Sequence, residues 1–199
     1  LAPVPWGQVS AAAGEFAGRC VMWAADAALR GDVAAMVTAP LHKEALFAAG
    51  APYDVYPGHT EMLQAAAARH RGVSVQEMPV RMMLANNELR TVLVSIHMSL
   101  RDAMDAVTYD NVLQTLRIAR TALRASLGRE PHMAVAGLNP HAGEGGLFGR
   151  EELETIAPAV AAARAEGCRV TGPLAPATVS MRARTKATEA REFDVVVAM

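Results

Sequence analysis

The spacing of apolar residues predicts several helices along the chain. Apolar side chains recur every three to four positions in these stretches, as they do on the buried face of an amphipathic helix. Gly31, Gly128 and Gly167 follow three of them, and glycine is common just past a helix end. The predicted helices are Ser10–Leu29, a short turn at Ala45–Ala49, His59–His70, Asp110–Leu127 and Glu151–Glu166.

Short apolar runs between the helices predict strands. The turn-prone pair Asn86-Asn87 joins two of these runs, which favours an antiparallel hairpin. Strands that alternate with helices favour an α/β fold, so we expect a mixed, largely parallel sheet with flanking helices. The predicted strands are Val33–Val37, Val80–Leu84, Thr91–Ile96, Met133–Ala136 and Asp194–Met199, with a short extended piece at Val170 and a loop over Gly50–Gly58.

Composition narrows the class of protein. The 199 residues suffice for one large domain or two small ones, and the hydrophobic fraction of 52% indicates a globular chain. A net charge of -1 indicates no excess of positive charge that would attract nucleic acid. No apolar run is long enough to span a membrane. Cys20 and Cys168 lie far apart and form no CxxC motif, which favours two buried free thiols and a cytoplasmic protein.

Four histidines occupy positions that favour a ligand site. His42, His97 and His141 each come shortly after a predicted strand, and His59 begins a predicted helix. In open α/β sheets, ligands bind beyond the carboxyl ends of the strands, so these side chains are expected at one edge. A single histidine in such a position is more often an ordinary loop or core residue, but the set as a whole favours a site.

The loop Leu138–Gly146 is the most informative segment. Its three glycines allow the backbone to approach a ligand, and the imidazole of His141 suits a divalent metal. The loop does not have the GxGxxG spacing of a dinucleotide-binding turn, and no Gly-Lys-Ser/Thr follows as in a P-loop. The alternative is a mobile glycine-rich surface loop.

A second candidate segment is Val94–Asp102. Its predicted strand leads directly to His97, and Asp102 follows within reach of that imidazole. Metal-bound histidines usually donate their other N–H to such a carboxylate. Arg101 and Asp102 could equally form an exposed ion pair.

Two further segments favour an anion. Gly58-His59-Thr60-Glu61 opens a predicted helix, where free N–H groups and the helix dipole attract a phosphate or carboxylate. Lys43 brings a cation close behind another strand end, and this lysine or a nearby histidine could assist proton transfer. The alternatives are a simple helix cap at Thr60 and the start of a surface helix at Lys43.

These four segments, in this order, resemble the 4-hydroxythreonine-4-phosphate dehydrogenase family of pyridoxine (vitamin B6) biosynthesis. The resemblance runs from near Ser10 to Met199. It implies a fold like that of isocitrate and isopropylmalate dehydrogenases. It also implies NAD-dependent oxidation of a secondary alcohol with a divalent metal (Zn, Mg, Mn or Co), followed by loss of CO₂. A homodimer that shares the metal site across its interface is implied as well.

The resemblance also assigns roles to individual residues. His97 and His141 match two metal ligands, and His59 and Thr60 match substrate-binding positions. The family's third ligand is a histidine in a Tyr-His-Asp-Gln-Gly segment after a strand like Asp194–Met199. Residues 1–199 are therefore expected to be the central part of one α/β dehydrogenase that could span two subdomains. Its N- and C-terminal parts are expected to be absent, and the fragment alone is expected to be inactive.

One departure from the family pattern affects the expected substrate. Ala177 stands where the family has an aspartate at the substrate site, and the stretch Arg182–Arg191 is longer and more charged than usual. The substrate is therefore expected to be 4-hydroxythreonine 4-phosphate, a related phosphorylated hydroxy acid or a dihydrodiol carboxylate. Two other hypotheses remain: a metal-dependent hydrolase that uses His97 and His141 around an activated water, and a family remnant without catalysis.

Overall fold

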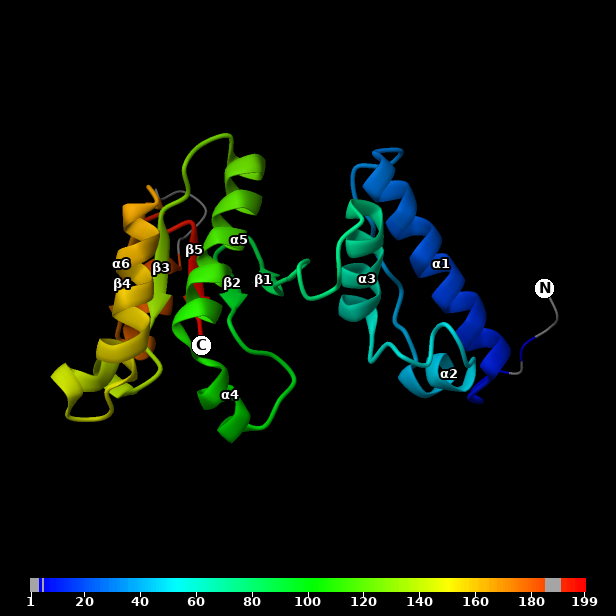
Figure 1. Cartoon of the computed structure of the whole chain (residues 1–199), viewed down its shortest axis with the longest axis horizontal. Helices are drawn as coiled ribbons and strands as arrows, with labels where there is room; N and C mark the ends of the chain where they lie inside the picture. Colours follow the sequence, from blue (N-terminus) through cyan, green and yellow to red (C-terminus); the bar gives the residue numbers. More distant parts are fainter. Residues whose placement is uncertain (1–3, 5, 185–190) are drawn as a thin grey trace. The chain divides into compact units, whose positions relative to one another are not determined.

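The computed structural model describes residue 4, residues 6–184 and residues 191–199. The chain divides into two compact units, Leu1–Val80 (unit 1) and Arg81–Met199 (unit 2), and Figure 1 shows the elements of each. Of the charged stretch Arg182–Arg191, residues 185–190 lie outside the described part. None of the helices in the described ranges combines the length and apolar character that crossing a membrane requires.

In its described residues, unit 1 is built from three helices, α1 (Ala11–Arg30), α2 (Lys43–Ala48) and α3 (His59–Arg71). They confirm the helices predicted in this part of the sequence. A Cβ on Gly14 would lie 1.8 Å from the carbonyl oxygen of Ala45, so the glycine permits α1 to approach α2 closely. The small apolar core of the unit is centred on Val21, Leu46 and Met62.

The strand predicted at Val33–Val37 is not formed. This stretch has no regular secondary structure, and the Val37 side chain is 97% exposed. A strand needs a neighbour to pair its N–H and C=O groups, and unit 1 contains no strand within the described residues. Cys20 also differs from expectation, because it is exposed on α1 whereas Cys168 is buried; both thiols are free.

The described residues of unit 2 form one five-stranded sheet in the order β1-β2-β5-β3-β4. The first pair is antiparallel and the other pairs are parallel, which confirms the mixed, largely parallel sheet. The Asn86 side chain stabilises the hairpin turn by accepting hydrogen bonds from the N–H groups of Glu88 and Leu89. The strands are β1 (Met83–Ala85), β2 (Arg90–Leu93), β3 (Met133–Ala136), β4 (Val170–Leu174) and β5 (Val195–Ala198).

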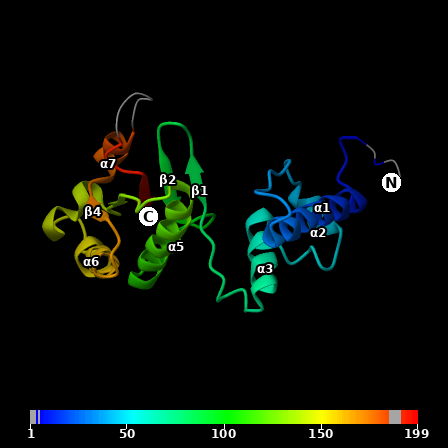
Figure 2. The ribbon, with the colours of Figure 1, turned by 90° about the horizontal axis from the view of Figure 1, so that it is seen from above.

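Helices cover both faces of this sheet. Val135 and Val197 face the core shared with α5 and α6, whereas Ala134 and Val196 face α7 and Phe193. Figure 2 shows α7 on the opposite side of the sheet from α5 and α6. The sequence patterns predict α5 and α6 but not α4 and α7. The helical segments are α4 (Leu100–Ala106), α5 (Tyr109–Leu127), the π-helical turn η2 (Glu152–Ile156), α6 (Ala157–Ala165) and α7 (Pro176–Ala183).

A buried carboxylate fixes the chain at the start of β5. Asp194 is 4% exposed and accepts hydrogen bonds from Arg129 at 2.8 and 2.6 Å and from the His132 N–H at 2.8 Å. Burial by itself raises the pKa of Asp194, but these hydrogen bonds, together with the charges of Arg129 and Arg90, outweigh it and leave the pKa below its ordinary value. The His132 side chain contacts Thr171 and Phe193 and has a structural role here.

Candidate functional site

His97 and His141 lie at the same edge of the sheet. Val92 of β2, Val197 of β5 and Val135 of β3 are in register, and the three strands run parallel. His97 comes five residues after Val92 and His141 six residues after Val135. The two histidines therefore follow the carboxyl ends of strands on either side of β5. With a strand spacing of about 4.8 Å, β2 and β3 are roughly 10 Å apart.

Both histidines adopt a backbone conformation that side chains disfavour. His97 has a φ of 53° and His141 a φ of 55°, in the left-handed region where a Cβ is crowded. Among the described residues, Ala142 and Glu144 are the other two non-glycine residues with a positive φ, and both belong to the His141 loop. Backbone strain of this kind gathers at functional sites, so it supports a role for this edge independently of the sequence motifs.

The His141 loop forms a left-handed turn. Six consecutive residues from His141 to Gly146 have positive φ values within the segment η1 (Pro140–Gly146). Glycine tolerates this conformation, but His141, Ala142 and Glu144 need contacts that hold them there. The loop donates hydrogen bonds to the buried carboxylate of Glu152. The sequence gives no sign of this role, because a charged residue in a predicted helix is usually exposed.

The surroundings of His97 differ from the expected arrangement. The carboxylate of Asp102 accepts a hydrogen bond from the Ser99 hydroxyl at 2.7 Å, and Ser99 caps α4. Asp102 thus stabilises the first turn of α4, and no hydrogen bond between Asp102 and His97 is seen in this structure. His97 and His141 are both exposed at the edge of the sheet.

The donor chemistry at this edge fits part of a metal site. Two imidazoles suit a divalent ion such as Zn²⁺, which usually takes at least three protein ligands. Within the described ranges, no group of three or more His, Cys, Asp or Glu residues could hold a metal ion. Ala177 follows β4, whose carboxyl end lies at the same edge, and supplies no carboxylate there.

The start of α3 has the features expected of an anion site. Gly58 precedes the helix and provides no side-chain cap, so the first N–H groups are not bonded to a capping side chain. Thr60 lies inside the first turn and is not the N-cap residue. A Cβ on Gly58 would lie 3.8 Å from the Lys43 Cε and 3.7 Å from a Glu61 carboxylate oxygen. Lys43, an exposed residue at the start of α2, is therefore beside the start of α3.

His59 and His42 have different surroundings. The Nε2 of His59 is buried without a hydrogen-bond partner, which makes it available to a ligand. The Nδ1 of His42 accepts a hydrogen bond from the Ala45 N–H at 3.4 Å, so His42 is the N-cap of α2. The structure thus groups His59, Thr60 and Lys43 in unit 1, and His97 and His141 in unit 2.

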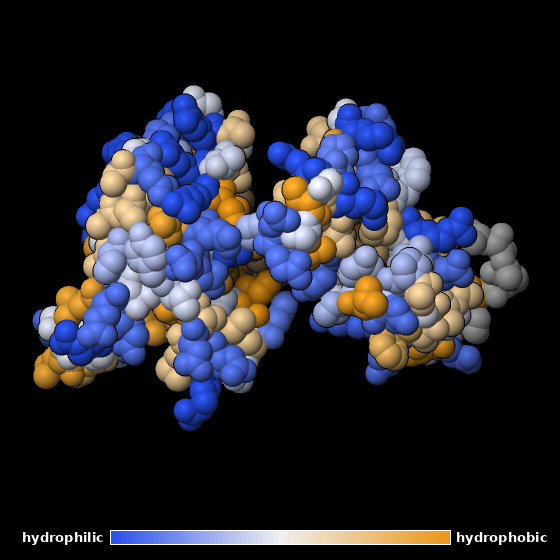
Figure 3. All heavy atoms as spheres, viewed as in Figure 1, coloured by the Kyte–Doolittle hydropathy of each residue, from blue (hydrophilic) through white to orange (hydrophobic). Residues whose placement is uncertain are grey.

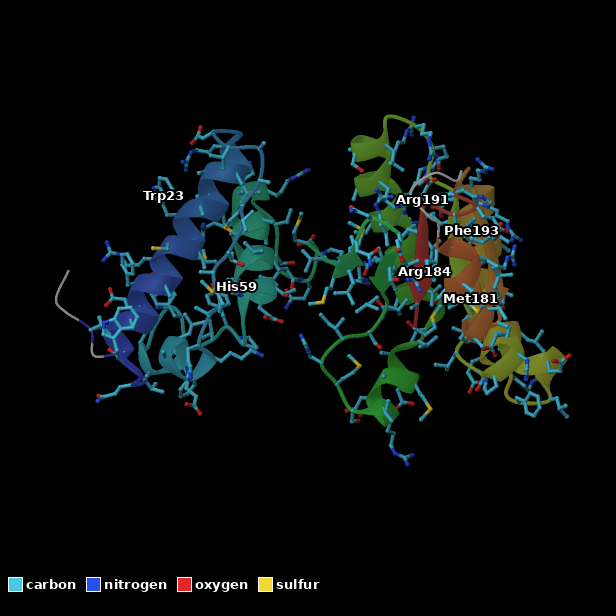
Figure 4. The ribbon with its side chains drawn as sticks, turned by 180° about the vertical axis from the view of Figure 1, so that it is seen from behind. Trp23, His59, Met181, Arg184, Arg191 and Phe193 are labelled. Atoms are coloured by element: carbon cyan, nitrogen blue, oxygen red, sulfur yellow. The ribbon has the colours of Figure 1, made fainter. Side chains whose placement is uncertain are left out.

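An apolar hollow of about 780 Å³ lies beside His59 in unit 1. It is lined by one face of α1 and by residues 36–41, and Trp23, which is 72% exposed, projects from that helix (Figure 4). Figure 3 shows that apolar residues reach the surface of both units. Neither Lys43 nor Thr60 lines the hollow, so it does not have the chemistry of the anion site.

Comparisons with known proteins show which proteins this chain is similar to. A 4-hydroxythreonine-4-phosphate dehydrogenase from Beijerinckia indica is 50% identical over 193 residues, which cover 96% of this chain and 52% of that protein. A D-threonate 4-phosphate dehydrogenase from Salmonella typhimurium is 44% identical and is covered to 54%. The chain therefore spans about half the length of the curated relatives it matches.

Solved structures show the same fold. A crystal structure of 4-hydroxythreonine-4-phosphate dehydrogenase from Klebsiella pneumoniae matches 98% of this chain and 54% of its own, with a TM-score of 0.83 and 42% identity. A terephthalate 1,2-cis-dihydrodiol dehydrogenase from Burkholderia xenovorans matches 99% of this chain and 57% of its own, with a TM-score of 0.67 and 31% identity. Residues 1–199 match the family described as pyridoxal phosphate biosynthetic protein PdxA, and the chain belongs to that family.

Proposed function

We propose that this chain forms the central part of an NAD- and divalent-metal-dependent dehydrogenase. Its substrate is a phosphorylated hydroxy acid, either 4-hydroxythreonine 4-phosphate or a close relative, which is oxidised at a secondary alcohol and then decarboxylated. The observation that carries the proposal is the placement of His97 and His141. Both follow parallel strands at one edge of the sheet, and both have a strained, left-handed backbone.

The residues of unit 2 have the metal-binding role in this proposal. His97 and His141 supply two imidazole ligands, and a third comes from a residue that follows the strand between them, as the family resemblance implies. When bound, the divalent ion acts as a Lewis acid toward the substrate oxygens, and NAD is the hydride acceptor. Because this chain offers two of the ligands, we expect the 199 residues alone to bind metal weakly and to lack turnover.

The residues of unit 1 have the anion-binding role. The N–H groups at the start of α3 and the Thr60 hydroxyl bind a phosphate, and the Lys43 ammonium adds a positive charge. The unpartnered His59 Nε2 donates a hydrogen bond to the substrate, or Lys43 assists a proton transfer. In a full-length enzyme, Thr60→Val should raise the KM for the phosphorylated substrate, whereas Thr121→Val on α5 should leave it unchanged. Equal KM values for Thr60→Val and the wild type would show that Thr60 does not bind the substrate.

Ala177 leaves the choice among these substrates open. It occupies the start of α7, where the family resemblance places an aspartate. D-Threonate 4-phosphate and dihydrodiol carboxylates are the alternatives suggested by the names of the relatives. If the missing carboxylate changes specificity, Ala177→Asp in a full-length enzyme should raise kcat/KM for 4-hydroxythreonine 4-phosphate relative to D-threonate 4-phosphate. An unchanged ratio would show that Ala177 does not determine the choice.

The assembly and location of the protein follow the same resemblance. We propose a cytoplasmic homodimer in which the second copy completes each active site. Sedimentation velocity of a full-length enzyme should give a dimer at micromolar concentration. Mixing a His141→Ala protomer with a protomer that lacks the ligand after β5 should restore activity if the ligands come from different subunits. A lack of restored activity would contradict shared sites.

One assay tests the proposal as a whole. Reduction of NAD, followed at the absorbance band of the reduced nicotinamide, is measured with each substrate and a divalent metal. We expect turnover in a full-length enzyme, dependence on both His97 and His141, and no turnover in the 199-residue chain. Substrate cleavage without NAD reduction would favour the hydrolase alternative. An inactive full-length enzyme with every substrate would favour a remnant without catalysis.

A further inference from the structure

The carboxylate of Glu152 is buried against the backbone of the His141 loop. Its side chain belongs to η2 and is 2% exposed. One oxygen accepts a hydrogen bond from the Asn139 N–H at 2.6 Å, and the other accepts one from the Asn139 side-chain amide at 2.9 Å. Asn139 precedes His141 by two residues, so both hydrogen bonds act on the entry to the left-handed turn.

Two glycines make room for this carboxylate. A Cβ on Gly137 would lie 2.9 Å from one oxygen of Glu152, and a Cβ on Gly143 would lie 2.7 Å from the other. Gly143 is also buried and has a φ of 76°. The loop therefore surrounds the carboxylate on both sides of His141, and larger residues at either glycine would separate the loop from Glu152.

Burying a carboxylate is costly unless other groups compensate for the lost water. In the described part of the chain, no lysine, arginine or histidine lies within ion-pair distance of Glu152. Its hydrogen-bond partners are both groups of Asn139. A side chain that served only to pack the core could be apolar at lower cost. The polar contacts instead concentrate on the loop that holds three of the four non-glycine residues with a positive φ among the described residues.

We propose that Glu152 is a positioning residue that holds the turn from Asn139 to Gly143 in its left-handed form and so presents the His141 imidazole at the edge of the sheet. The role in metal binding rests on the proposed function, whereas the role in fixing the loop rests on the contacts alone. Outer contacts that orient a metal-binding histidine typically change metal affinity by about 10- to 100-fold when they are removed.

The test uses the untagged 199-residue chain and four variants. Glu152→Gln keeps the shape but places an amide N–H against the Asn139 amide, and Glu152→Asp keeps the charge but is one methylene shorter. Glu154→Gln, an exposed glutamate paired with Arg150, is the matched control, and His141→Ala removes the ligand itself. Amide hydrogen exchange is measured along unit 2, and Co²⁺ affinity is measured by visible absorption.

We expect Glu152→Gln to speed exchange of the amides over residues 139–146 at least tenfold, with the amides of β3 and α5 unchanged. Its Co²⁺ affinity should fall by about 10- to 100-fold. Glu152→Asp should lie between Glu152→Gln and the wild type, and Glu154→Gln should match the wild type. This set of results would support a positioning role.

Other results would overturn the inference. Equal loop exchange in Glu152→Gln and the wild type would show that the carboxylate does not fix the loop. Faster exchange throughout β3 and α5 would show that Glu152 only stabilises unit 2. If His141→Ala binds Co²⁺ as tightly as the wild type, the proposed metal site is wrong. The exchange data then still decide, by themselves, whether Glu152 holds the loop.

Discussion

The two units differ in how the segments outside their helices and strands are held. In unit 2, buried carboxylates accept hydrogen bonds from segments next to the sheet: Glu152 from the His141 loop, and Asp194 from the segment before β3. In unit 1, the segment over residues 33–41 has no secondary structure, and Val37 is almost fully exposed. Unit 1 shows no buried carboxylate in the described part of the chain.

The difference shows what each kind of segment needs. One nearby side chain can hold a polar, glycine-rich loop in place, because the hydrogen bonds of the loop are local and its glycines allow close contact. An extended apolar segment needs a neighbouring strand along its whole length. Substitutions should therefore be costly at the buried groups of unit 2 and nearly neutral at the open segment of unit 1.

The largest expected effect is at Asp194. Asp194→Asn should lower the free energy of unfolding of unit 2 by about 3 kcal/mol at pH 7, because an amide cannot accept all the hydrogen bonds that the buried carboxylate receives from Arg129 and His132. The matched control is Asp26→Asn in unit 1, whose exposed pair with Arg69 should contribute less than about 1 kcal/mol. Urea unfolding followed by hydrogen exchange in each unit measures both. Equal losses would contradict the contrast between the units.

The same group makes unit 2 sensitive to acid. The pKa of Asp194 in the folded protein is below its ordinary value of 3.8, so its contribution is fully present above that value and is lost as the pH falls through the lowered pKa. We expect the free energy of unfolding to fall from about pH 4 downward in the wild type. The fall should be shallower in Asp194→Asn. Identical pH profiles would show that other carboxylates determine the acid sensitivity.

Two glycines of the His141 loop offer a sharper test. Gly143→Ala places a Cβ against Glu152 at a positive φ, whereas Gly145→Ala has a similar φ of 66° and nothing within 4 Å. Gly145→Ala should cost about 1 kcal/mol for the backbone alone, and Gly143→Ala about 2 kcal/mol more. Thermal unfolding by circular dichroism compares them. Equal losses would mean that the contact with Glu152 is unimportant.

The smallest effect is expected in the open segment of unit 1. Val37→Thr should change the free energy of unfolding by less than about 0.5 kcal/mol, because the side chain is 97% exposed. The same substitution at the fully buried Val135 of β3 should cost about 2 kcal/mol, because it buries a hydroxyl group. A large loss at Val37 would reveal a packed environment for this segment.

The sequence by itself determined the elements whose signals are local. Ser10 caps the start of α1 and Gly31 caps its end. Asn86 stabilises the predicted hairpin turn. Alternating strands and helices indicated the parallel sheet, and that arrangement placed His97 and His141 at one edge. The sequence could do this because caps, turns and periodicity depend on residues a few positions apart.

The tertiary structure decided the features that depend on distant partners. The sequence predicts a strand at Val33–Val37, but this segment has no neighbouring strand to pair with and forms no regular secondary structure. The sequence predicts Glu152 to be an exposed helical residue, but the loop that begins at Asn139 folds over Glu152 and buries it. The left-handed backbone of His97 and His141 has no signal in the sequence, since neither is a glycine. Burial, pairing and strain arise from groups brought together by folding, so only the folded chain reveals them.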